Sequence, residues 1–374
     1  NDIATDSYKQ PGSSFKSLVL ATALENGFVP NDIIDGDPGM LPYDDPITNQ
    51  VELKYQGNSK VPDTKQCTNF SVGEGGTSTL TSQTTHSVNC AFWRLGQIVG
   101  LEKVIDLAKK LGITNAFTNA SPSDIAKTSP QNQVTVANFL NPWFPNMAFG
   151  GSFGVHAIDM ASVYSTFAND GVHNEPYFVD KITNADGKVL YQHTAAPQPV
   201  MSPQSARLLT QVLKANVDGG TGTQARLSNG QDAAGKTGTT DEAKNLWFDG
   251  YTPQLTTVVW VGDGSDAEVP LFGGSAQGGQ IPADTWGLFM NAWLRAYNVP
   301  NQDFTAPAPT RPGTYINTGP SDGDPFNPAA YNSGGYPGQG GPTYQTGPSG
   351  SSSPQSPQTP SSPQTTAAPA TSAP

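Results

Sequence analysis

Two residues that could act together as nucleophile and base, Ser13 and Lys16, lie three positions apart near the start of the chain. Residues with this spacing share one face of a helix. Burial would lower the pKa of the lysine and leave a neutral amine, which can take the proton of a neighbouring serine hydroxyl group. Such a pair occurs about once by chance in a chain of this length at average composition. Ser13 is therefore a candidate nucleophile that needs support from other motifs.

Two further motifs supply that support, although each is weak by itself. Ser87 and Asn89 would place a hydroxyl group and a carboxamide beside a cleft, where one relays a proton and the other holds an amide. Lys236, Thr237 and Gly238 would form an edge that binds a carboxylate, and the glycine would let a substrate backbone lie against the chain. Because three independent motifs occur in one required order, together they are a strong signal.

Two other patterns match catalytic motifs but lack the context that those motifs need. Residues 230–237, GQDAAGKT, fit a phosphate-binding loop, which requires an apolar strand before it and a helix after it. Polar residues precede this stretch, and a Gly-Thr-Thr run that favours extended chain follows it. Residues 150–154, GGSFG, fit a nucleophile elbow, but the two prolines in the preceding NPWFPNMAF make a poor strand. We therefore expect neither a nucleotide site nor an esterase.

The elements that would position the motifs are indicated by periodicity and turn residues. Residues 10–27 predict a helix that is apolar nearly all round and therefore buried, with a glycine at each end. Residues 233–240, 246–251 and 256–261 are β-type runs, and a Thr-Pro-Gln turn joins the last two as consecutive antiparallel strands. Lys236 would lie in the first of these strands.

The remaining segments complete the expected fold. Helices are predicted over residues 90–100, 101–111, 155–168, 203–216 and 282–297, and a hairpin over 177–191. Residues 28–85 and 114–151 are rich in Gly, Pro, Asn and Asp and predict irregular chain. We expect one α/β domain of residues 1–299 with an antiparallel sheet at its centre.

Composition separates this domain from a tail. Of the 33 prolines, 15 follow residue 300, and aliphatic residues are scarce there, so residues 300–374 predict a disordered Pro/Ser/Gly-rich tail. The net charge of −12, with no basic stripe, argues against a nucleic-acid partner. No apolar run approaches the ~18 residues that cross a membrane. The chain begins at Asn1 without a leader, which indicates a mature product or a fragment.

The cysteines and histidines indicate no metal site, and we expect no cofactor. Cys67 and Cys90 are the two cysteines, and the four histidines are scattered, whereas zinc takes about four ligands. A Cys67–Cys90 disulfide is favoured and would indicate an oxidising compartment. Two unpaired thiols are the alternative, because spacing alone cannot show proximity.

The three motifs resemble the S-x-x-K, S-x-N and K-T-G motifs of the penicillin-recognising serine acyltransferases. The surrounding text is similar to the transpeptidase domain of class A (bifunctional) penicillin-binding proteins of the actinobacterial type. The similarity covers about residues 5–298, and the matching stretches are QPGSSFK, DMASVYSTFANDGVHNEP, GGTGTQA, AAGKTGTT, KNLWFDGYTPQLTTVVWVG and GGQIPADTW. It implies a penicillin-binding-protein or serine-β-lactamase-like fold, with helices on both sides of the sheet.

The resemblance also implies a role for each motif residue. Ser13 would attack the penultimate D-Ala carbonyl of a stem peptide that ends in D-Ala-D-Ala, and Lys16 would take the serine proton. Ser87 would pass a proton to the leaving amine, and Lys236 would tune Ser87 electrostatically. Asn89 would hold the substrate amide and help to fix Lys16.

The same resemblance implies the rest of the reaction and its setting. Thr237 and Thr239 would bind the terminal carboxylate, and the backbone N–H groups of Ser13 and Thr239 would form the oxyanion hole. An amine of a second stem peptide would then resolve the acyl-enzyme and cross-link peptidoglycan. β-Lactam antibiotics would acylate Ser13 as substrate mimics. The protein would work at the extracytoplasmic face of the bacterial cell membrane.

One departure from the family and two alternative functions accompany this interpretation. The family's five-stranded sheet begins with two strands before the nucleophile helix, whereas only twelve residues precede Ser13. The expectation is thus a truncated chain, without those strands, the membrane anchor and the glycosyltransferase domain. A D,D-carboxypeptidase or serine β-lactamase is one alternative. The other is a non-catalytic penicillin-binding sensor or scaffold whose tail recruits cell-wall or division proteins.

Overall fold

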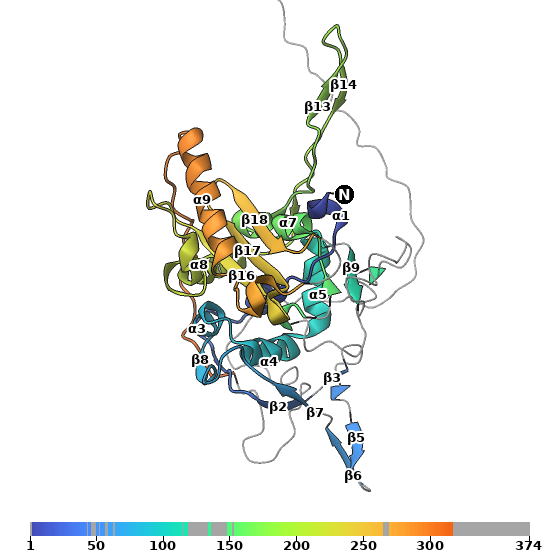
Figure 1. Ribbon diagram of the computed structural model, residues 1–374, viewed down its shortest axis with the longest axis vertical. Helices are drawn as coiled ribbons and strands as arrows, with labels where there is room; N and C mark the ends of the chain where they lie inside the picture. Colours follow the sequence, from blue (N-terminus) through green and yellow to red (C-terminus); the bar gives the residue numbers. More distant parts are fainter. Residues whose placement is uncertain are drawn as a thin grey trace, which may run out of the picture. The chain divides into compact units, whose positions relative to one another are not determined.

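The computed structural model describes residues 2–316, with gaps at 43, 46–49, 52, 57–58, 63, 114, 119–133, 136–147, 152 and 265–268. Contacts divide the chain into Asn1–Gly335 and Tyr336–Pro374, and the second unit lies wholly outside the described residues. The description below concerns the first unit (Figure 1).

The buried helix predicted over residues 10–27 is present in two parts. A 3-10 turn, η1 (Gly12–Phe15), leads into α2 (Lys16–Glu25), where every residue except Glu25 is buried. This helix is apolar all round because the main hydrophobic core surrounds it. The chain enters the turn through Gly12, whose φ of +54° favours glycine and whose position would bring a Cβ atom within 2.6 Å of Thr239 O.

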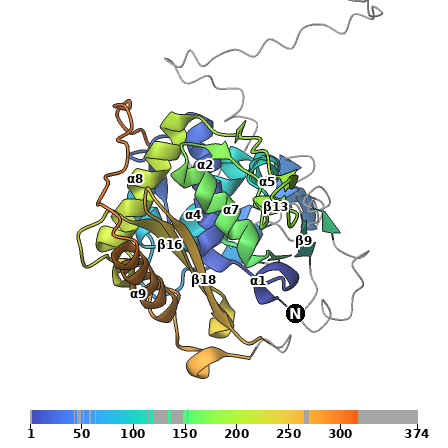
Figure 2. The same ribbon diagram turned by 90° about the horizontal axis from the view of Figure 1, so that it is seen from above.

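The predicted three strands form one antiparallel sheet in the order β16 (Ala234–Thr239), β17 (Asn245–Tyr251) and β18 (Thr256–Gly262). Alternate residues of β17 enter different cores. Trp247 and Tyr251 pack with α2, α7 (Ala157–Ala168) and α8 (Pro203–Gly219), whereas Phe248 packs with α9 (Ile281–Ala296). Figure 2 shows α9 on one side of the sheet and α2 and α7 on the other. The predicted sheet covered by helices on both sides is confirmed.

The segment of residues 28–85 is more regular than its composition predicts. It contains the antiparallel pairs β1 (Ile33–Asp35) with β8 (Thr77–Thr79), and β2 (Gly39–Pro42) with β7 (Thr64–Cys67). Two further pairs come between β2 and β7 in the sequence: β3–β4 (Asp44–Asp45 with Gln50–Val51) and β5–β6 (Leu53–Gln56 with Ser59–Pro62). Strands of two to four residues are too short to show a periodic pattern.

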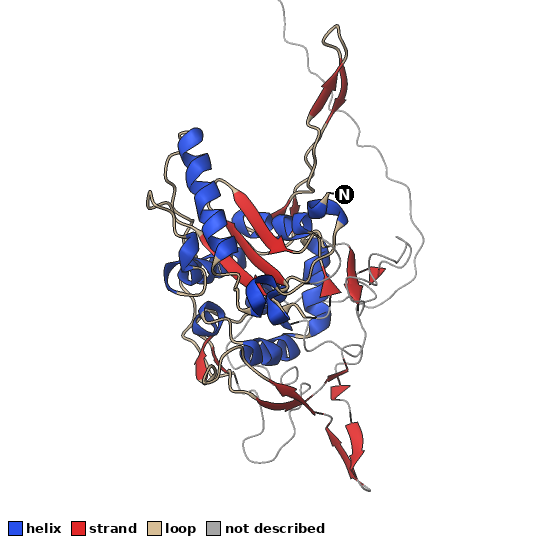
Figure 3. Ribbon diagram, viewed as in Figure 1, coloured by secondary structure: helices blue, strands red, loops and turns tan. Residues whose placement is uncertain are grey.

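The other predicted elements agree with the structure to within a few residues. The helices predicted over residues 90–100 and 101–111 are α4 (Asn89–Val99) and α5 (Leu101–Lys110). The helix before them, α3 (Leu80–Thr85), lies at the end of the segment predicted to be irregular. Within the predicted irregular residues 114–151, the structure describes β9 (Asn115–Thr118) and β10 (Val134–Thr135), which pair, and β11 (Phe153–Gly154) also pairs with β9. The predicted hairpin is β13 (Lys181–Thr183) with β14 (Val189–Gln192), and all its strand residues are exposed (Figure 3).

Residues 301–316 belong to the segment expected as a tail, yet they pack against the domain. Arg311 donates two hydrogen bonds of 2.7 Å to the wholly buried carboxylate of Asp32. Thr314 O accepts from Ile33 N, and the side chain of Ile316 is buried in the main core. The average composition of the tail hides these residues, because the few side chains that pack on the domain, such as Arg311 and Ile316, are outnumbered by Pro, Ser and Gly. The remainder of the expected tail lies outside the described residues.

Candidate active site

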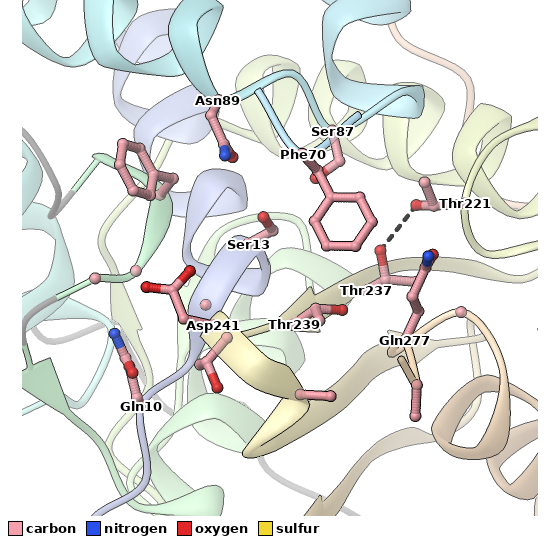
Figure 4. Close-up of a pocket in the computed structure, with 18 of the residues that line it drawn as sticks. Gln10, Ser13, Phe70, Ser87, Asn89, Thr221, Thr237, Thr239, Asp241 and Gln277 are labelled. Atoms are coloured by element: carbon pink, nitrogen blue, oxygen red, sulfur yellow. Dashed lines mark hydrogen bonds between the residues drawn. The ribbon is translucent and has the colours of Figure 1, made fainter. Parts of the chain in front are cut away.

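The three sequence motifs meet at one cavity of about 320 Å³. Ser13 lies on the η1 turn and faces this cavity, with Ser87 and Asn89 on one side and Thr237 and Thr239 of β16 on the other (Figure 4). Segments that are 74 to 226 residues from Ser13 in the sequence therefore converge on it. The sheet and the buried helix α2 hold them in place.

Lys16 lies behind Ser13 and is wholly buried. Its Nζ atom donates to Ser87 O at 2.6 Å and to Asn89 Oδ1 at 2.7 Å. Burial and the positive charge of Lys236 lower the pKa of Lys16 well below its ordinary value, against an opposing effect of Glu74. The pKa of Lys16 is thus shifted in the direction that a neutral base requires.

Ser87 connects the first motif to the third. It lies between α3 and α4 and has a left-handed backbone, with φ of +58°. Its hydroxyl group accepts a hydrogen bond from Lys236 Nζ at 2.9 Å and faces Lys16 Nζ at 3.3 Å. Lys236 is also wholly buried, and burial lowers its pKa to about 7, while the charge of Asp249 opposes this shift. Both lysines therefore converge on one serine.

The edge strand β16 presents two hydroxyl groups to the cavity. Thr237 Oγ1 lies 2.8 Å from Thr221 Oγ1, and Thr239 Oγ1 accepts a hydrogen bond of 3.0 Å from Gly278 N. Lys236 points its amine to the same end of the cavity as Thr237, whose hydroxyl group it approaches at 3.3 Å. Two hydroxyl groups and an ammonium group at one end form a suitable site for a carboxylate.

Gly238 is required here for a different reason from the predicted one. A Cβ atom at this position would lie 2.4 Å from Pro11 O and 2.8 Å from Trp247 Cβ. Its missing side chain thus lets the turn before Ser13 lie directly on β16. Pro11 and Trp247 fill the space on this side of Gly238.

A disulfide bond joins Cys67 to Cys90, with a Cα–Cα distance of 5.8 Å. It ties the end of β7 to the first turn of α4, directly after Asn89. Asn69 Oδ1 accepts from Cys90 N at 2.9 Å beside it. Phe70 and Glu74, from the loop that follows, line the cavity. The disulfide therefore fixes one wall of the site.

The structure explains why the phosphate-loop pattern is not a nucleotide site. Residues 235–237 lie inside β16, and the chain after them turns into β17 through η6 (Asp241–Ala243) without a long helix, so no phosphate-binding loop forms. Ser152 of the other motif lies outside the described residues. Gly150, before it, packs on the Gly12 backbone and accepts a hydrogen bond from Gly12 N at 3.2 Å. Among the described residues, no group of three or more His, Cys, Asp or Glu side chains could hold a metal ion.

Sequence reasoning missed several residues of the site. Thr221 lies in the glycine cluster after α8, and its hydroxyl group contacts that of Thr237. Phe70 and Glu74 are in a loop with no local motif. Asp249 lies under the site within an otherwise apolar strand, and this interruption of NLWFDGY was the available signal.

This fold, with the three motifs around one cavity, defines the class of penicillin-binding proteins. The chain belongs to the family of the penicillin-binding protein transpeptidase domain, whose model matches residues 1–281. The sequence motifs and the relatives place the chain among the transpeptidase domains of class A penicillin-binding proteins.

Sequence relatives and solved structures agree on this family. The chain is 32% identical over 298 residues to penicillin-binding protein 1A of Clostridium acetobutylicum, covering 79% of this chain and 32% of that protein. It is 30% identical over 319 residues to penicillin-binding protein 1A of Mycobacterium tuberculosis, covering 82% and 34%. The structure of the penicillin-binding protein PonA1 from M. tuberculosis matches with a TM-score of 0.65 and 26% identity, covering 87% of this chain and 78% of that one.

PonA1 has also been solved in complex with penicillin V, and that structure matches with a TM-score of 0.64 and 27% identity, covering 86% of this chain and 77% of that one. The chain spans about a third of the length of the curated relatives it matches, namely 32% and 34% of the two named above. In the part of the chain that the structure describes, no helix is both long and apolar enough to cross a membrane.

Proposed function

We propose that this chain carries the D,D-transpeptidase activity of a peptidoglycan-synthesising protein and forms a serine acyl-enzyme at Ser13. One observation carries the proposal: Lys16 and Lys236, both wholly buried, direct their amines at Ser87 beside the cavity that contains Ser13. Such an arrangement of nucleophile, neutral base and proton relay suits acyl transfer.

In the first half-reaction, Ser13 Oγ attacks the carbonyl carbon of the penultimate D-Ala, and Lys16 Nζ takes the hydroxyl proton. The peptide C–N bond then breaks, and the leaving amine receives a proton through Ser87. Lys236, at 2.9 Å from Ser87 Oγ, assists this transfer electrostatically. The products are free D-Ala and an ester between Ser13 and the stem peptide.

Substrate binding uses the rim of the cavity. Thr237 and Thr239 bind the terminal carboxylate with the help of Lys236, and the Asn89 carboxamide holds a substrate amide. The backbone N–H groups of Ser13 and Thr239 stabilise the oxyanion. In the second half-reaction, the side-chain amine of another stem peptide attacks the ester, so that Ser13 regains its proton and a cross-link forms. β-Lactams enter the same path by acylating Ser13.

We infer the location from the chemistry and the disulfide. Peptidoglycan stem peptides lie outside the cytoplasmic membrane, and a disulfide is typical of an oxidising compartment. The extracytoplasmic face of the cell membrane satisfies both. The reaction needs no metal and no cofactor. Cell-wall or division proteins are proposed partners of the longer protein.

Labelling with fluorescent penicillin tests the proposal. Wild-type protein should form a stable adduct, and peptide mass spectrometry should locate it on Ser13. Ser13→Ala should give no adduct. Ser14→Ala is the matched control, since Ser14 Oγ points away and donates to Pro11 O at 2.8 Å. An adduct on another residue, or labelling of Ser13→Ala, would contradict the assignment.

The fate of the adduct separates the alternative functions. Cross-linked product from lipid-linked glycan strands supports the transpeptidase. Rapid release of hydrolysed penicillin would favour a D,D-carboxypeptidase or β-lactamase. Stable acylation without any cross-linking would favour a penicillin-binding sensor or scaffold.

A further inference from the structure

A carboxyl group lies buried directly behind the site, at Asp249 of β17. In the antiparallel register Asp249 is opposite Lys236 of β16, and both residues are 0 % exposed. Residues directly opposite in a sheet have their side chains on the same face, with Cβ atoms about 5 Å apart. The acid and the lysine therefore form a cross-strand pair under the cavity.

This carboxyl group has no ordinary structural role in the strand. Its neighbours on the same face, Trp247 and Tyr251, belong to the main hydrophobic core. Both carboxyl oxygens are buried, and among the described residues neither has a hydrogen-bond partner. The hydroxyl group of Ser14, in η1, lowers the pKa of Asp249. It donates its proton, however, to Pro11 O at 2.8 Å. An unpaired buried carboxyl group destabilises a fold, so its presence here calls for a functional explanation.

The charges around Asp249 leave Lys236 as its main electrostatic partner. From α2, Lys16 lies near enough to Lys236 for the charge of Lys236 to lower its pKa. From α7, Tyr164 faces Asp249, and burial raises the pKa of this tyrosine well above its ordinary value. Tyr251, next but one on β17, donates to or accepts from Thr210 of α8 at 2.9 Å, and burial raises its pKa too. The strand β18 brings only Val258 opposite Asp249. Both tyrosines are therefore neutral.

Burial and mutual attraction set the protonation of the pair. Burial raises the pKa of Asp249 to about 8, and the Ser14 side chain and the charge of Lys236 both oppose this rise. Burial lowers the pKa of Lys236 to about 7, and the charge of Asp249 opposes this fall. Near neutral pH the two groups thus exchange a proton at small energetic cost.

We propose that Asp249 is a positioning residue of the acyl-transfer site: its carboxyl group lies opposite Lys236 and favours the protonated form of that lysine, which donates to the Ser87 hydroxyl group and thereby orients it. A protonated Lys236 can only donate to Ser87 Oγ, so the Ser87 proton must point away from Lys236, either to Lys16 Nζ at 3.3 Å or into the cavity where the leaving amine lies. A neutral Lys236 could accept that proton and turn it away. This inference rests on the proposed function.

The rate of acylation by fluorescent penicillin, measured from pH 5.5 to 9.5, tests the proposal. Wild-type protein should lose rate on the alkaline side as Lys236 deprotonates. In Asp249→Asn this alkaline limb should move about one pH unit lower, because the opposite charge is gone. At the pH of the limb the rate should then fall about tenfold, while labelling stays on Ser13. Superimposable profiles would overturn the proposal.

Controls separate positioning from stability. Asp249→Val fits the apolar surroundings and should show the same shift if the asparagine variant does not fold. Asp32→Asn alters another wholly buried aspartate away from the cavity and should leave the alkaline limb unchanged. A shift of equal size in Asp32→Asn would overturn the assignment. If wild-type protein is not acylated, the proposed function itself fails, whereas a labelled wild type with an unshifted Asp249→Asn refutes only this inference.

Stability gives a second readout with a definite sign. Because the pKa of Asp249 is raised from 3.8 to about 8 on folding, this carboxyl group binds more protons in the folded state than in the unfolded state between these values. Lys236, whose pKa is lowered from 10.5 to about 7, has the opposite effect only above about pH 7. The contribution of the pair to the free energy of unfolding should therefore fall as pH rises from 3.8 to about 7. Asp249→Asn should flatten that slope. A change in stability without any change in the acylation profile would show a merely structural role and contradict the proposal.

Discussion

Replacing Arg311 by Met tests how residues 301–316 are held on the domain. The substitution keeps the apolar stem of the side chain and removes its charge. Asp32 is 0 % exposed and receives two hydrogen bonds from Arg311, at 2.7 Å each. Removing one partner of a buried ion pair costs about 3–5 kcal/mol. Asp32 keeps hydrogen bonds from Thr314 N and Val29 N, both 2.8 Å, so we expect a loss near 3 kcal/mol, the lower end of that range.

Urea unfolding of the whole chain, followed by tryptophan fluorescence, measures this loss. The matched control is Arg207→Met, because Arg207 also donates two hydrogen bonds to one carboxylate, that of Asp170, at the surface, where these side chains are 31% and 42% exposed. Its stability should change little, since solvent screens an exposed pair. In Arg311→Met/Asp32→Asn part of the loss should return. A loss below about 1 kcal/mol for Arg311→Met, as for a surface pair, would refute the reasoning.

Two further experiments test the packing of the turn before Ser13 and the contribution of the disulfide to stability. Gly238→Ala would place a methyl group 2.4 Å from Pro11 O, so the turn before Ser13 must shift, and penicillin acylation should slow by about a hundredfold; an unchanged rate would show that the turn is not fixed by this contact. Reduction of the Cys67–Cys90 disulfide, or Cys67→Ser/Cys90→Ser, should lower the free energy of unfolding by about 3 kcal/mol, because a cross-link over a 23-residue separation constrains the unfolded chain. Equal unfolding midpoints with and without reductant would contradict this expectation.

The sequence predicted those elements of the fold that have a long local signal. The helix α2 could be found because it is apolar all round and ends at Asn26-Gly27, and β17 and β18 because a turn sequence separates them. The prediction for α8 stopped at Asn216, whereas the helix continues to Gly219, since a glycine is tolerated in the last turn. Short ladders such as β2–β7 depend on contacts between distant residues and leave no local pattern.

The candidate site shows the same division. Ser13, Ser87 and Lys236 could be selected because their motifs occur in a required order, and their roles remain proposals that the geometry supports. The position of Asp249 opposite Lys236 depends on strand register, which the sequence did not specify to one residue. Thr221 depends on how the chain after α8 folds back to β16.

The left-handed backbone of Ser87 implies a conflict between the stability of the fold and the proposed proton transfer through its hydroxyl group. At a φ of +58°, the backbone conformation of a serine costs about 1 kcal/mol more than that of a glycine. Glycine at position 87 would keep the carbonyl oxygen that accepts from Lys16 and would relieve this strain, but it would remove the hydroxyl group that both lysines approach. Selection for thermal stability alone would thus favour Ser87→Gly. The serine is retained at the expense of stability, so thermostabilisation of this domain should leave position 87 untouched.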